Sequence, residues 1–418
     1  MDLMSERQWK RWDAVGRVNA EKLTLREAAA ICGVSIRQLR RLRRRVAEQG
    51  KAGLVHRGQG RAAPNRIDAK LRDRVVNLRR GKYERFNDQH LSEKLREEIP
   101  PIELSVRTIR RILRAAGFAP MRRRRTRLHR RRRERKAQAG LMLLWDGSPH
   151  AWLEERGPRL CLIGAVDDAT ADLLPGVHFV EQECAAAYLR TLKAIVAELG
   201  IPWSIYMDQH GSLKRNDGHW TLAEELRGRQ DPTQVGMALE ALQIEAIYAL
   251  SPQGKGRVER LWATLQDRLV SELRLAGVCT AEQANAVLER YRPEHNRRFA
   301  IAPRDTAPAW RPLRRGVDLE RICSLHYQAT VRRDNTVHLG GSVVIDIPPG
   351  PRRRSYADKR VEVCQLLDRS WRVYDGDQLI AIRPATDHGE LRTLKRRKNG
   401  RGAPLSPPTH ADYAEVSP

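Results

Sequence analysis

The amino-acid sequence predicts a multidomain fold: an α-helical N-terminal region with helix-turn-helix units, an α/β core and a small C-terminal β-barrel. Apolar residues recur at helical spacing in the first 118 residues, apolar runs alternate with amphipathic helices over residues 138–312, and two-residue alternation follows. A chain of 418 residues is also longer than a single hydrophobic core usually organises. We therefore expect several domains.

Residues 1–50 are predicted to contain two helices joined at Gly33, the pattern of a helix-turn-helix unit. Thr24 is the expected N-cap of the first helix, with Glu27 as its capping-box partner, and Ser35 opens the second. The positions expected to face inward are Leu25, Ala28, Ala29, Ile31, Val34, Ile36, Leu39 and Leu42. The side chains expected to face outward, as DNA groove reading requires, are Ser35, Arg37, Gln38, Arg40 and Arg41. An ordinary helical hairpin with a charged face would show the same pattern.

A second helix-turn-helix unit is predicted over residues 67–118, after a linker at 51–66 that is rich in Gly, Pro and Arg. Its turn runs from Ile99 to Ile102, and Ser105 is the expected cap of the following helix. Its inward positions are Phe86, Leu91, Leu95, Val106, Ile109, Ile112 and Leu113. Its outer face carries Arg107, Arg110, Arg111 and Arg114. Two such units in tandem favour the helix-turn-helix interpretation over a simple hairpin.

Positive charge is concentrated in the N-terminal third of the chain. Residues 1–140 hold 40 of the 78 Lys and Arg but only 15 of the 51 Asp and Glu, so +25 of the formal net charge of +27 lies there. A basic linker at 119–137 includes Arg122, Arg123, Arg124 and Arg125. Alone, such a run is a solvated linker; after two helix-turn-helix units it favours phosphate contacts and strongly salt-dependent binding. Double-stranded DNA is therefore the expected partner.

Residues 138–312 are predicted to form the α/β core. Three apolar runs of strand length end in Asp146, in the pair Asp167 and Asp168, and in Asp208. A shorter strand is expected at 177–180 and a helix at 184–200, and a later helix carries an apolar stripe. That stripe consists of Val258, Leu261, Trp262, Leu265 and Leu269.

Three acidic residues lie at compatible positions in this core. Asp146 and Asp208 end predicted strands, and Glu259 lies in the first turn of the helix that follows the SPQGKG loop. Carboxylates gathered at one edge of a sheet suit hard cations such as Mg²⁺ or Mn²⁺. Asp167 and Asp168 are rival ligands, although an acidic pair at a strand end is more often a turn or a helix cap. Each acid alone is more often structural, so the prediction depends on all three.

The motifs WDGSPHAWL, AVDDAT, YMDQHGS and SPQGKGRVERLWATLQDRL occur in that order and are followed by NRRFAIAPRDTAPAWRP. This order resembles the DDE transposase and retroviral-integrase superfamily, in particular insertion-sequence transposases of the ISNCY group. The resemblance spans most of the chain and implies a ribonuclease-H-like core whose catalytic and metal-binding triad is Asp146, Asp208 and Glu259. The 51 residues from Asp208 to Glu259 exceed the spacing common among relatives, and an insertion, KRNDGHWTLAEELRGRQDPTQVG, supplies the extra length.

The resemblance also implies a reaction. Two Mg²⁺ or Mn²⁺ ions about 3.5 to 4 Å apart would activate the attacking water or 3′-hydroxyl and stabilise the leaving oxygen. Relatives cut DNA at the terminal inverted repeats of a mobile element and join the freed ends to target DNA, which implies a homo-oligomer that pairs two ends. Lys255 and Arg257, next to Glu259, would contact flanking phosphates, unless they belong to a solvated loop.

Residues 313–383 alternate apolar and polar positions around turns at Asp334-Asn335 and Asp375-Gly376, which predicts a small β-barrel. It would contact DNA or a partner protomer, or serve only stability. Residues 384–418 are predicted to be a disordered tail. We expect solvent exposure for the acids of the insertion, and surface or hydrogen-bonding roles for nearby histidines. These residues are Asp217, Glu224, Glu225 and Asp231, and His150, His210 and His219.

Composition excludes several classes of protein. No apolar run approaches the roughly 20 residues of a membrane helix and no secretory signal is evident, so we expect a cytoplasmic protein without membrane contact. The resemblance to insertion-sequence transposases implies a bacterial, nucleoid-associated protein. Six scattered cysteines without a CxxC pair indicate buried, reduced thiols. An aromatic content of 5% disfavours RNA binding. Two alternatives stay open, a non-enzymatic DNA-binding regulator and a catalytically inactive relative.

Overall fold

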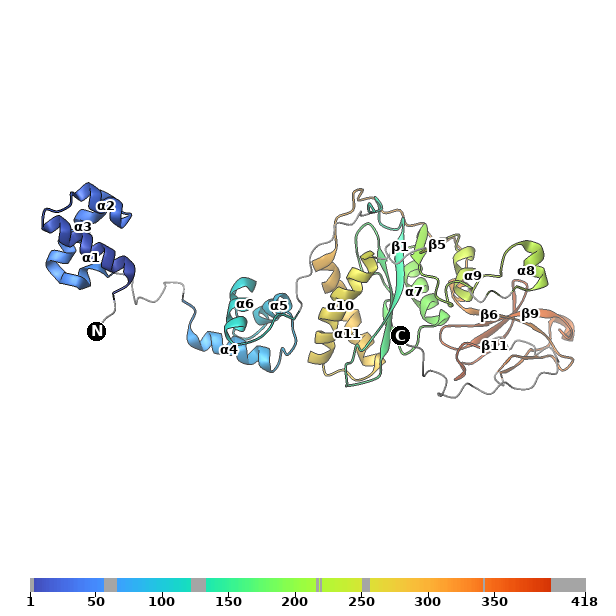
Figure 1. Cartoon of the computed structure of the whole chain (residues 1–418). Coiled ribbons are helices and arrows are strands. Elements are labelled where there is room, and N and C mark those ends of the chain that lie inside the picture. The colour runs from blue at the N-terminus through green and yellow to red at the C-terminus, as the bar shows by residue number, and fades with distance from the viewer. Residues whose placement is uncertain are drawn as a thin grey trace, which may run out of the picture. The chain divides into compact units, whose positions relative to one another are not determined.

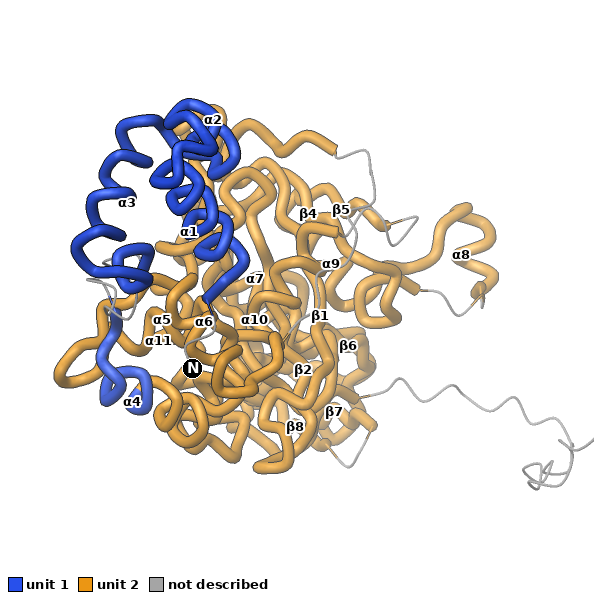
Figure 2. Tube along the Cα trace, turned by 60° about the vertical axis from the view of Figure 1, so that its left-hand side comes forward, with its two compact units in different colours: residues 1–74 blue, residues 75–418 orange. Residues whose placement is uncertain are grey.

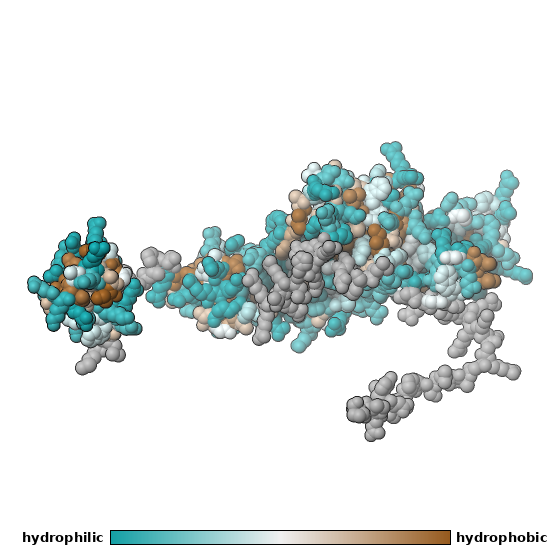
Figure 3. Space-filling view, turned by 45° about the horizontal axis from the view of Figure 1, so that its top comes forward, coloured by the Kyte–Doolittle hydropathy of each residue, from teal (hydrophilic) through white to brown (hydrophobic). Residues whose placement is uncertain are grey.

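The computed structural model describes residues 4–55, 66–121, 133–215, 218, 220–249, 256–340 and 343–391. The chain forms two compact units, residues 1–74 and 75–418 (Figure 2). Figure 1 labels the helices and strands of both units. In Figure 3 hydrophilic residues cover most of the visible surface, and hydrophobic residues appear in small separate areas. On the face that Figure 3 shows, few of the apolar residues of the two units are therefore at the surface.

The first unit contains α1 (Glu6–Asn19), α2 (Leu25–Cys32), α3 (Ile36–Gln49) and the short 3-10 helix η1 (Gly50–Leu54). The predicted caps are confirmed: Thr24 and Glu27 form a capping box at the start of α2, and Ser35 Oγ accepts a hydrogen bond from Gln38 N at 3.2 Å. Gly33 has a φ of 61°, the left-handed conformation that glycine adopts without strain. It ends α2 and directs the chain into α3.

Two of the predicted inward positions in this unit are wrong. Ile31 and Ile36, which flank the turn, are 55% and 40% exposed. The reason is α1, which sequence patterning left out and which contributes buried residues to the core. The buried residues of this three-helix core are Ala14, Val15, Val18, Ala28, Ala29 and Leu39. Because α2 and α3 pack against α1 as well as each other, the side chains at the turn itself stay outside the core.

The segment predicted to be a second helix-turn-helix unit contains α5 (Asp88–Arg96) and α6 (Val106–Ala115), preceded by α4 (Ala69–Arg80), which spans the boundary between the units. Ser105 caps α6 as predicted, accepting a hydrogen bond from Thr108 N at 3.2 Å. The predicted core positions Phe86, Leu91, Leu95, Ile109, Ile112 and Leu113 are buried. Val106 is only partly buried, because it lies in the first turn of α6.

The core contains a five-stranded sheet of β1 (Leu143–His150), β2 (Leu160–Asp167), β3 (His178–Val180), β4 (Ser204–Met207) and β5 (Glu245–Tyr248). The strand order is β3-β2-β1-β4-β5. Strand β2 is antiparallel to β1 and β3, whereas β4 is parallel to β1 and β5 is parallel to β4. This mixed sheet has the ribonuclease-H-like topology that the resemblance implies. Strand β5 was not predicted.

Helices cover both faces of this sheet (Figure 1). Helix α7 (Ala185–Glu198) and α9 (Gln234–Ala241) share one hydrophobic core with Leu143 and Trp145 of β1. Helices α10 (Gly256–Leu275) and α11 (Ala281–Phe299) share the other with Leu144. Successive side chains of a strand point to opposite faces, so β1 contributes to both cores.

The insertion between Asp208 and β5 contains α8 (Leu222–Arg227) and the first three residues of α9. The prediction that Glu224 faces solvent is wrong, since its side chain is fully buried and paired with Arg215. Hydrogen bonds from the backbone N–H groups of Asp231 and Thr221, at 2.8 and 2.7 Å, lower the pKa of Glu224 to about 2. Glu225 and Asp231 are exposed as expected. Asp217 and His219 lie outside the described residues.

The C-terminal region begins with α12 (Leu319–Ile322) and forms two antiparallel sheets. Strands β11 (Gln378–Arg383), β10 (Trp371–Asp375), β9 (Arg360–Gln365) and β6 (Leu325–Thr330) form one sheet in that order. Strands β7 (Thr336–His338) and β8 (Val344–Asp346) form the other, and η4 (Pro351–Arg353) is a 3-10 turn. Both sheets enclose one apolar core that includes Val337, Ile345, Val363 and Trp371. The pairings among the described strands do not join the sheets into a closed barrel.

Residues 384–391, at the start of the predicted tail, are held against this sheet. Trp371 Nε1 donates to Thr386 Oγ1 at 3.0 Å, and Gln365 Nε2 donates to the carbonyl oxygen of His388 at 2.8 Å. Residues 392–418 lie outside the described residues.

The cysteines match the prediction of buried thiols only in part. Cys161, Cys323 and Cys364 are buried free thiols, and burial raises the pKa of Cys161 and of Cys323 to about 12. Cys32 and Cys184 are half-buried. The prediction is wrong for Cys279, which is exposed. Cys279 lies in the turn between α10 and α11, outside the hydrophobic cores. The backbone N–H groups of Cys279 and Thr280 donate hydrogen bonds to the side chain of Gln283 in this turn.

Candidate active site

Asp146 lies in β1, and Asp208 directly follows β4, the parallel neighbour of β1. Strand β1 pairs with β4 so that Leu143 faces Ile205 and Leu144 faces Tyr206. The pairing ends at Tyr206; if the same register continued two residues further, Asp146 would lie opposite Asp208, at the roughly 4.8 Å that separates neighbouring strands. Asp208 directly follows β4, whereas Asp146 lies inside β1, which continues to His150. The expectation that a strand ends at Asp146 is therefore wrong, since antiparallel pairing with β2 extends β1.

Helix α10 approaches Asp146 through a tryptophan. Trp262 Nε1 donates a hydrogen bond to Asp146 Oδ2 at 3.1 Å. Glu259 lies three residues earlier, in the first turn of α10, and therefore on a neighbouring face of the same helix. Glu259 is exposed, whereas Val258, Trp262 and Leu265 are buried against the sheet. The tether therefore holds the N-terminal end of α10 next to β1.

The three acids do not form a compact cluster. Within the described residues, the ligand atoms of Asp146, Asp208 and Glu259 are not all within 4.8 Å of one another, since the group that meets this criterion is a different one. The structure brings the two aspartates onto neighbouring strands and places Glu259 at the start of the helix tethered to one of them. Ligands of two ions about 3.5 to 4 Å apart need not all lie within one ion's coordination distance.

A fourth carboxylate lies next to the aspartates and was not singled out from the sequence. A Cβ atom built on Gly147 would lie 2.8 Å from Glu183 Oε2, so the glycine permits close approach of this carboxylate to β1. Tyr188 donates its hydroxyl hydrogen to Glu183 Oε1. Burial raises the pKa of Tyr188 first, and the negative charges of Glu183, Asp146 and Asp208 raise it further. Three carboxylates therefore surround one tyrosine.

His210 connects two of these carboxylates. Its backbone N–H donates to Asp208 Oδ1 at 3.0 Å, and its Nδ1 lies 3.3 Å from Glu183 Oε1. This agrees with the hydrogen-bonding role expected for His210. An acid immediately before an amphipathic helix is the only sequence signal for Glu183, and the same signal marks ordinary helix starts.

The rival acids Asp167 and Asp168 have structural partners. Asp167 accepts backbone hydrogen bonds from Gly140 at 2.7 Å and Ala169 at 2.9 Å, and burial raises its pKa. Asp168 is fully buried and accepts a bidentate pair from Arg133, at 2.6 and 3.2 Å. Arg257 also pairs with Asp168. Burial alone would raise the pKa of Asp168, but its bonds from Arg133, Lys136 N and Arg257 bring it below the ordinary value.

The predicted DNA-contacting side chains differ in how available they are. Those on α3, at Arg37, Gln38, Arg40 and Arg41, are exposed, while Ser35 is also exposed and caps the helix. On α6, Arg107 and Arg111 are exposed, but Arg110 and Arg114 pair with Asp88 at 3.1 and 2.7 Å. Arg257 pairs with Asp168, as described above. Arg122, Arg123, Arg124, Arg125 and Lys255 lie outside the described residues.

A helix-turn-helix unit and a ribonuclease-H-like core with carboxylates on adjacent strands together define a DNA-processing enzyme. Residues 10–63 match the family model described as a helix-turn-helix domain. Over 423 aligned residues, the chain is 33% identical to transposase y4bF of Sinorhizobium fredii, with 96% of this chain and 89% of the relative covered. It is 30% identical to the transposase of insertion sequence IS1202 of Streptococcus pneumoniae, with 69% and 68% covered. The chain belongs to the insertion-sequence transposases, and its function is DNA transposition.

Solved structures show weaker similarity. A chain of the simian T-cell lymphotropic virus intasome is 13% identical with a TM-score of 0.31, covering 73% of this chain and 95% of that one. The HTLV-2 integrase catalytic core, solved with magnesium, is 16% identical with a TM-score of 0.25, covering 36% and 85%. The family assignment therefore depends on the two sequence relatives. None of the described helices is both long and apolar enough to cross a membrane.

Proposed function

We propose that the chain binds the terminal inverted repeats of its mobile element and catalyses DNA cleavage and strand transfer with Asp146, Asp208 and Glu259. The observation that supports this proposal is the pairing of Leu143 and Leu144 in β1 with Ile205 and Tyr206 in β4, a register that, if continued two residues, would bring Asp146 opposite Asp208. The hydrogen bond from Trp262 to Asp146 supports the third residue, because it holds the start of α10 near them. A regulator without catalysis is not favoured, since both sequence relatives are transposases.

The donor set fits Mg²⁺ or Mn²⁺, and we propose two such ions. All three side chains offer carboxylate oxygens, which hard divalent cations prefer. When bound, the ions would activate the attacking water or 3′-hydroxyl and stabilise the leaving oxygen. Asp146 is oriented by Trp262 and Asp208 by the backbone of His210, so both carboxylates have one oxygen held by the protein. Glu259 is exposed, which leaves its side chain free to adjust as DNA binds.

Positively charged groups would guide DNA to this site. We propose that α3 and α6 contact the element ends, and that the segment of Arg122 to Arg125 contacts the phosphates between them and the core. Lys255 would contact a phosphate near the scissile bond. Arg257 would contact a phosphate only if its ion pair with Asp168 were broken. We therefore expect replacement of Arg257 to affect the stability of the fold more than DNA binding. Concerted joining requires two ends at once, so we propose an active homo-oligomer on DNA; an active species that sediments as a monomer would contradict this.

The exposed arginines of α3 give one prediction. Replacing Arg40 and Arg41 together by alanine should weaken binding to the terminal repeat by about 10- to 100-fold and lower the slope of log affinity against log salt by about 2, one for each phosphate contact. Fluorescence anisotropy at several salt concentrations measures both quantities. The control is Arg17→Ala on α1, whose side chain pairs with Asp13. Unchanged affinity and slope in the double variant would place the DNA contact elsewhere.

Glu183 gives a second prediction. Glu183→Gln keeps the size of the side chain but removes its negative charge beside Asp208 and Tyr188. Outer partners of metal ligands typically contribute 10- to 100-fold in metal affinity. The Mg²⁺ concentration for half-maximal cleavage should therefore rise by about tenfold, while the rate at saturating Mg²⁺ changes less. Glu181→Gln, an exposed acid two residues away, is the matched control. An identical Mg²⁺ dependence in both variants would restrict Glu183 to a structural role.

A further inference from the structure

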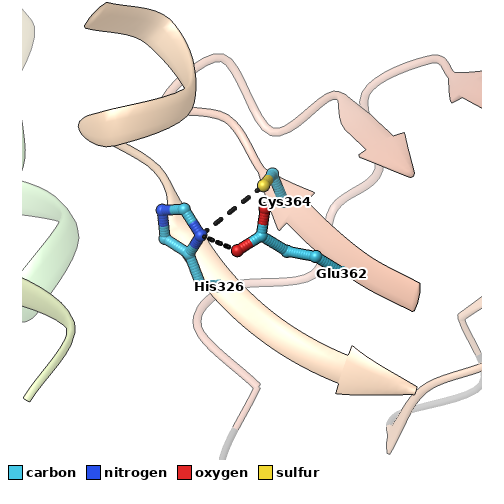
Figure 4. Close-up of side chains that lie close together, drawn as sticks. All are labelled: His326, Glu362 and Cys364. Atoms are coloured by element: carbon cyan, nitrogen blue, oxygen red, sulfur yellow. Dashed lines mark hydrogen bonds and ion pairs between the residues drawn. The ribbon is translucent and has the colours of Figure 1, made fainter. Parts of the chain in front are cut away.

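Three side chains that could bind a metal ion, His326, Glu362 and Cys364, lie together on β6 and β9 of the C-terminal sheet (Figure 4). His326 of β6 faces Cys364 of β9 directly, and Glu362 lies two residues before Cys364. Side chains two residues apart share one face of a strand, so all three project from the same face of the sheet. Their ligand atoms all lie within 4.8 Å of one another.

Two of the distances between these atoms are close to those of ligands that share an ion. His326 Nδ1 lies 3.0 Å from Glu362 Oε1 and 3.7 Å from Cys364 Sγ. Zinc binds nitrogen and carboxylate oxygen at about 2.0 to 2.2 Å and thiolate sulfur at about 2.3 Å in a tetrahedral arrangement. These lengths imply separations of about 3.4 Å between nitrogen and oxygen and about 3.6 Å between nitrogen and sulfur. The observed arrangement therefore needs adjustments of only a few tenths of an ångström.

The surroundings orient His326 as a metal ligand. Ser324 Oγ donates to the carbonyl oxygen of Arg321 at 2.6 Å, and it lies 3.3 Å from His326 Nε2. Because that hydroxyl hydrogen is already used, the serine oxygen is left to accept the Nε2 hydrogen. The neutral ring then presents the Nδ1 lone pair to Glu362 and Cys364. Metal-binding histidines are commonly held in this way by a hydrogen bond to the other ring nitrogen.

Glu362 is oriented in the same sense. Arg321 Nε and Nη2 donate to Glu362 Oε2 at 2.9 and 2.6 Å, which leaves Oε1 toward His326. Cys364 is fully buried, whereas the side chains of His326 and Glu362 are 17% and 24% exposed. The group is therefore mostly buried, with part of the His326 and Glu362 side chains reaching the surface.

We propose that His326, Glu362 and Cys364 form a zinc site that links β6 to β9, with a fourth coordination position left for water. A thiolate and an imidazole favour Zn²⁺ over Mg²⁺, so the chemistry of this site differs from that of the all-carboxylate active site. The thiolate and the carboxylate balance the charge of the ion, and Arg321 holds the carboxylate oxygen on the far side. Sequence spacing gave no indication of this site, because its ligands are 36 and 38 residues apart along the chain.

The site lies where the C-terminal sheet meets the core. The side chain of Gln234 in α9 accepts a hydrogen bond from His326 N at 2.7 Å and donates one to His326 O at 2.9 Å. Cys323 and Leu325, next to these residues, belong to the hydrophobic core that includes α7 and α9. An ion at His326 would therefore stiffen the strand through which the catalytic core holds the C-terminal sheet.

A shared proton is the competing occupant. Burial lowers the pKa of His326, but the adjacent Cys364 and Glu362 raise it by more, to about 10. The interaction with His326 is also the largest factor lowering the pKa of Glu362, to about 2. Without an ion, the group would hold a protonated imidazole between the two partners. Cys364 is a metal-bound thiolate in the zinc state but not in the state with a protonated imidazole. Absorption spectroscopy distinguishes the two states, because a thiolate bound to Co²⁺ produces a charge-transfer band.

The test uses the full-length protein after treatment with a chelator, titrated with Co²⁺ alone as a spectroscopic substitute for Zn²⁺. We expect one equivalent of Co²⁺ to produce a thiolate-to-metal charge-transfer band, excess Zn²⁺ to remove that band, and Zn²⁺ to raise the midpoint of thermal unfolding. The carboxylates of the active site cannot produce the band, because they contain no sulfur.

Variants assign the band to these residues. Cys364→Ser and His326→Gln should abolish it, and Ser324→Ala should weaken Co²⁺ binding by about tenfold. Cys279→Ser, at an exposed thiol, should retain it. Circular dichroism of the metal-free variants verifies that they fold. If Cys364→Ser or His326→Gln fails to fold, the Co²⁺ affinity of Ser324→Ala still tests the proposal. Absence of the band in the wild type, its persistence in Cys364→Ser, or equal Co²⁺ affinity in Ser324→Ala would overturn the zinc site and leave the shared proton.

Discussion

Asp208→Asn is expected to abolish DNA cleavage and strand transfer, by about 10³-fold or more, while binding to the terminal repeat stays within twofold. The amide keeps the hydrogen-bonding oxygen near His210 N but removes the negative charge that balances a divalent cation. A bound ion contributes several kcal/mol of charge stabilisation in the transition state, and each 1.36 kcal/mol corresponds to a tenfold change in rate. Gel-based cleavage of a labelled terminal repeat with Mg²⁺ or Mn²⁺ measures the rate.

The same loss is expected for Asp146→Asn and for Glu259→Gln. Asp231→Asn is the matched control, since this exposed acid lies in the insertion of the same core and pairs with Arg227 on the surface. Removal of divalent cations by EDTA should reproduce the effect of the three variants in the wild type. Cleavage that persists in EDTA, or in any one of the three variants, would show that this set of residues does not hold the catalytic ions.

Asp168→Asn is expected to destabilise the second unit by about 3 kcal/mol, because removing one partner of a buried ion pair leaves the other charges uncompensated. Asp168 is fully buried and binds Arg133 through both oxygens, while Arg257 pairs with it as well. Urea unfolding monitored by circular dichroism measures the change. Asp231→Asn again serves as control. The side chains of Asp231 and Arg227, which form an ion pair, are 57% and 48% exposed, so loss of this pair should cost less than about 1 kcal/mol.

The stability difference between wild type and Asp168→Asn should depend on pH. The pKa of Asp168 is lowered in the folded protein, so its contribution to stability is fully present above the ordinary aspartate pKa of about 4 and is lost as pH falls through the lowered value. The two proteins should therefore differ most at neutral pH and converge in acid. A difference that stays constant down to pH 2 would mean that packing, and not the charge of Asp168, accounts for the effect.

Arg257 connects these two predictions. It lies two residues before Glu259 in α10, and its pairing with Asp168 ties the first turn of this helix to the end of β2. Loss of Asp168 should therefore also reduce cleavage, because the position of Glu259 depends on that turn. The reduction should be smaller than for Asp208→Asn, since the tether from Trp262 to Asp146 remains.

Local features of the sequence determined most of the elements. Thr24, Glu27, Ser35 and Ser105 are caps whose hydrogen bonds involve residues three positions away, so the chain itself specifies where those helices begin. Apolar runs determined β1, β2 and β4, and the order of motifs identified the family and the candidate acids. These signals are local or are carried by residue order, and no knowledge of distant contacts is needed to use them.

Only the tertiary structure decided what depends on partners far apart in the chain. Ile31 and Ile36 are exposed because α1 occupies the core next to them, and Glu224 is buried because its carboxylate is bonded by Arg215 and two backbone N–H groups. Glu183 lies against β1 because Gly147 leaves room for its carboxylate. His326 meets Cys364 through the register of β6 and β9, which sequence spacing does not encode. The sequence specifies which groups are present, while packing and strand register determine which of them meet.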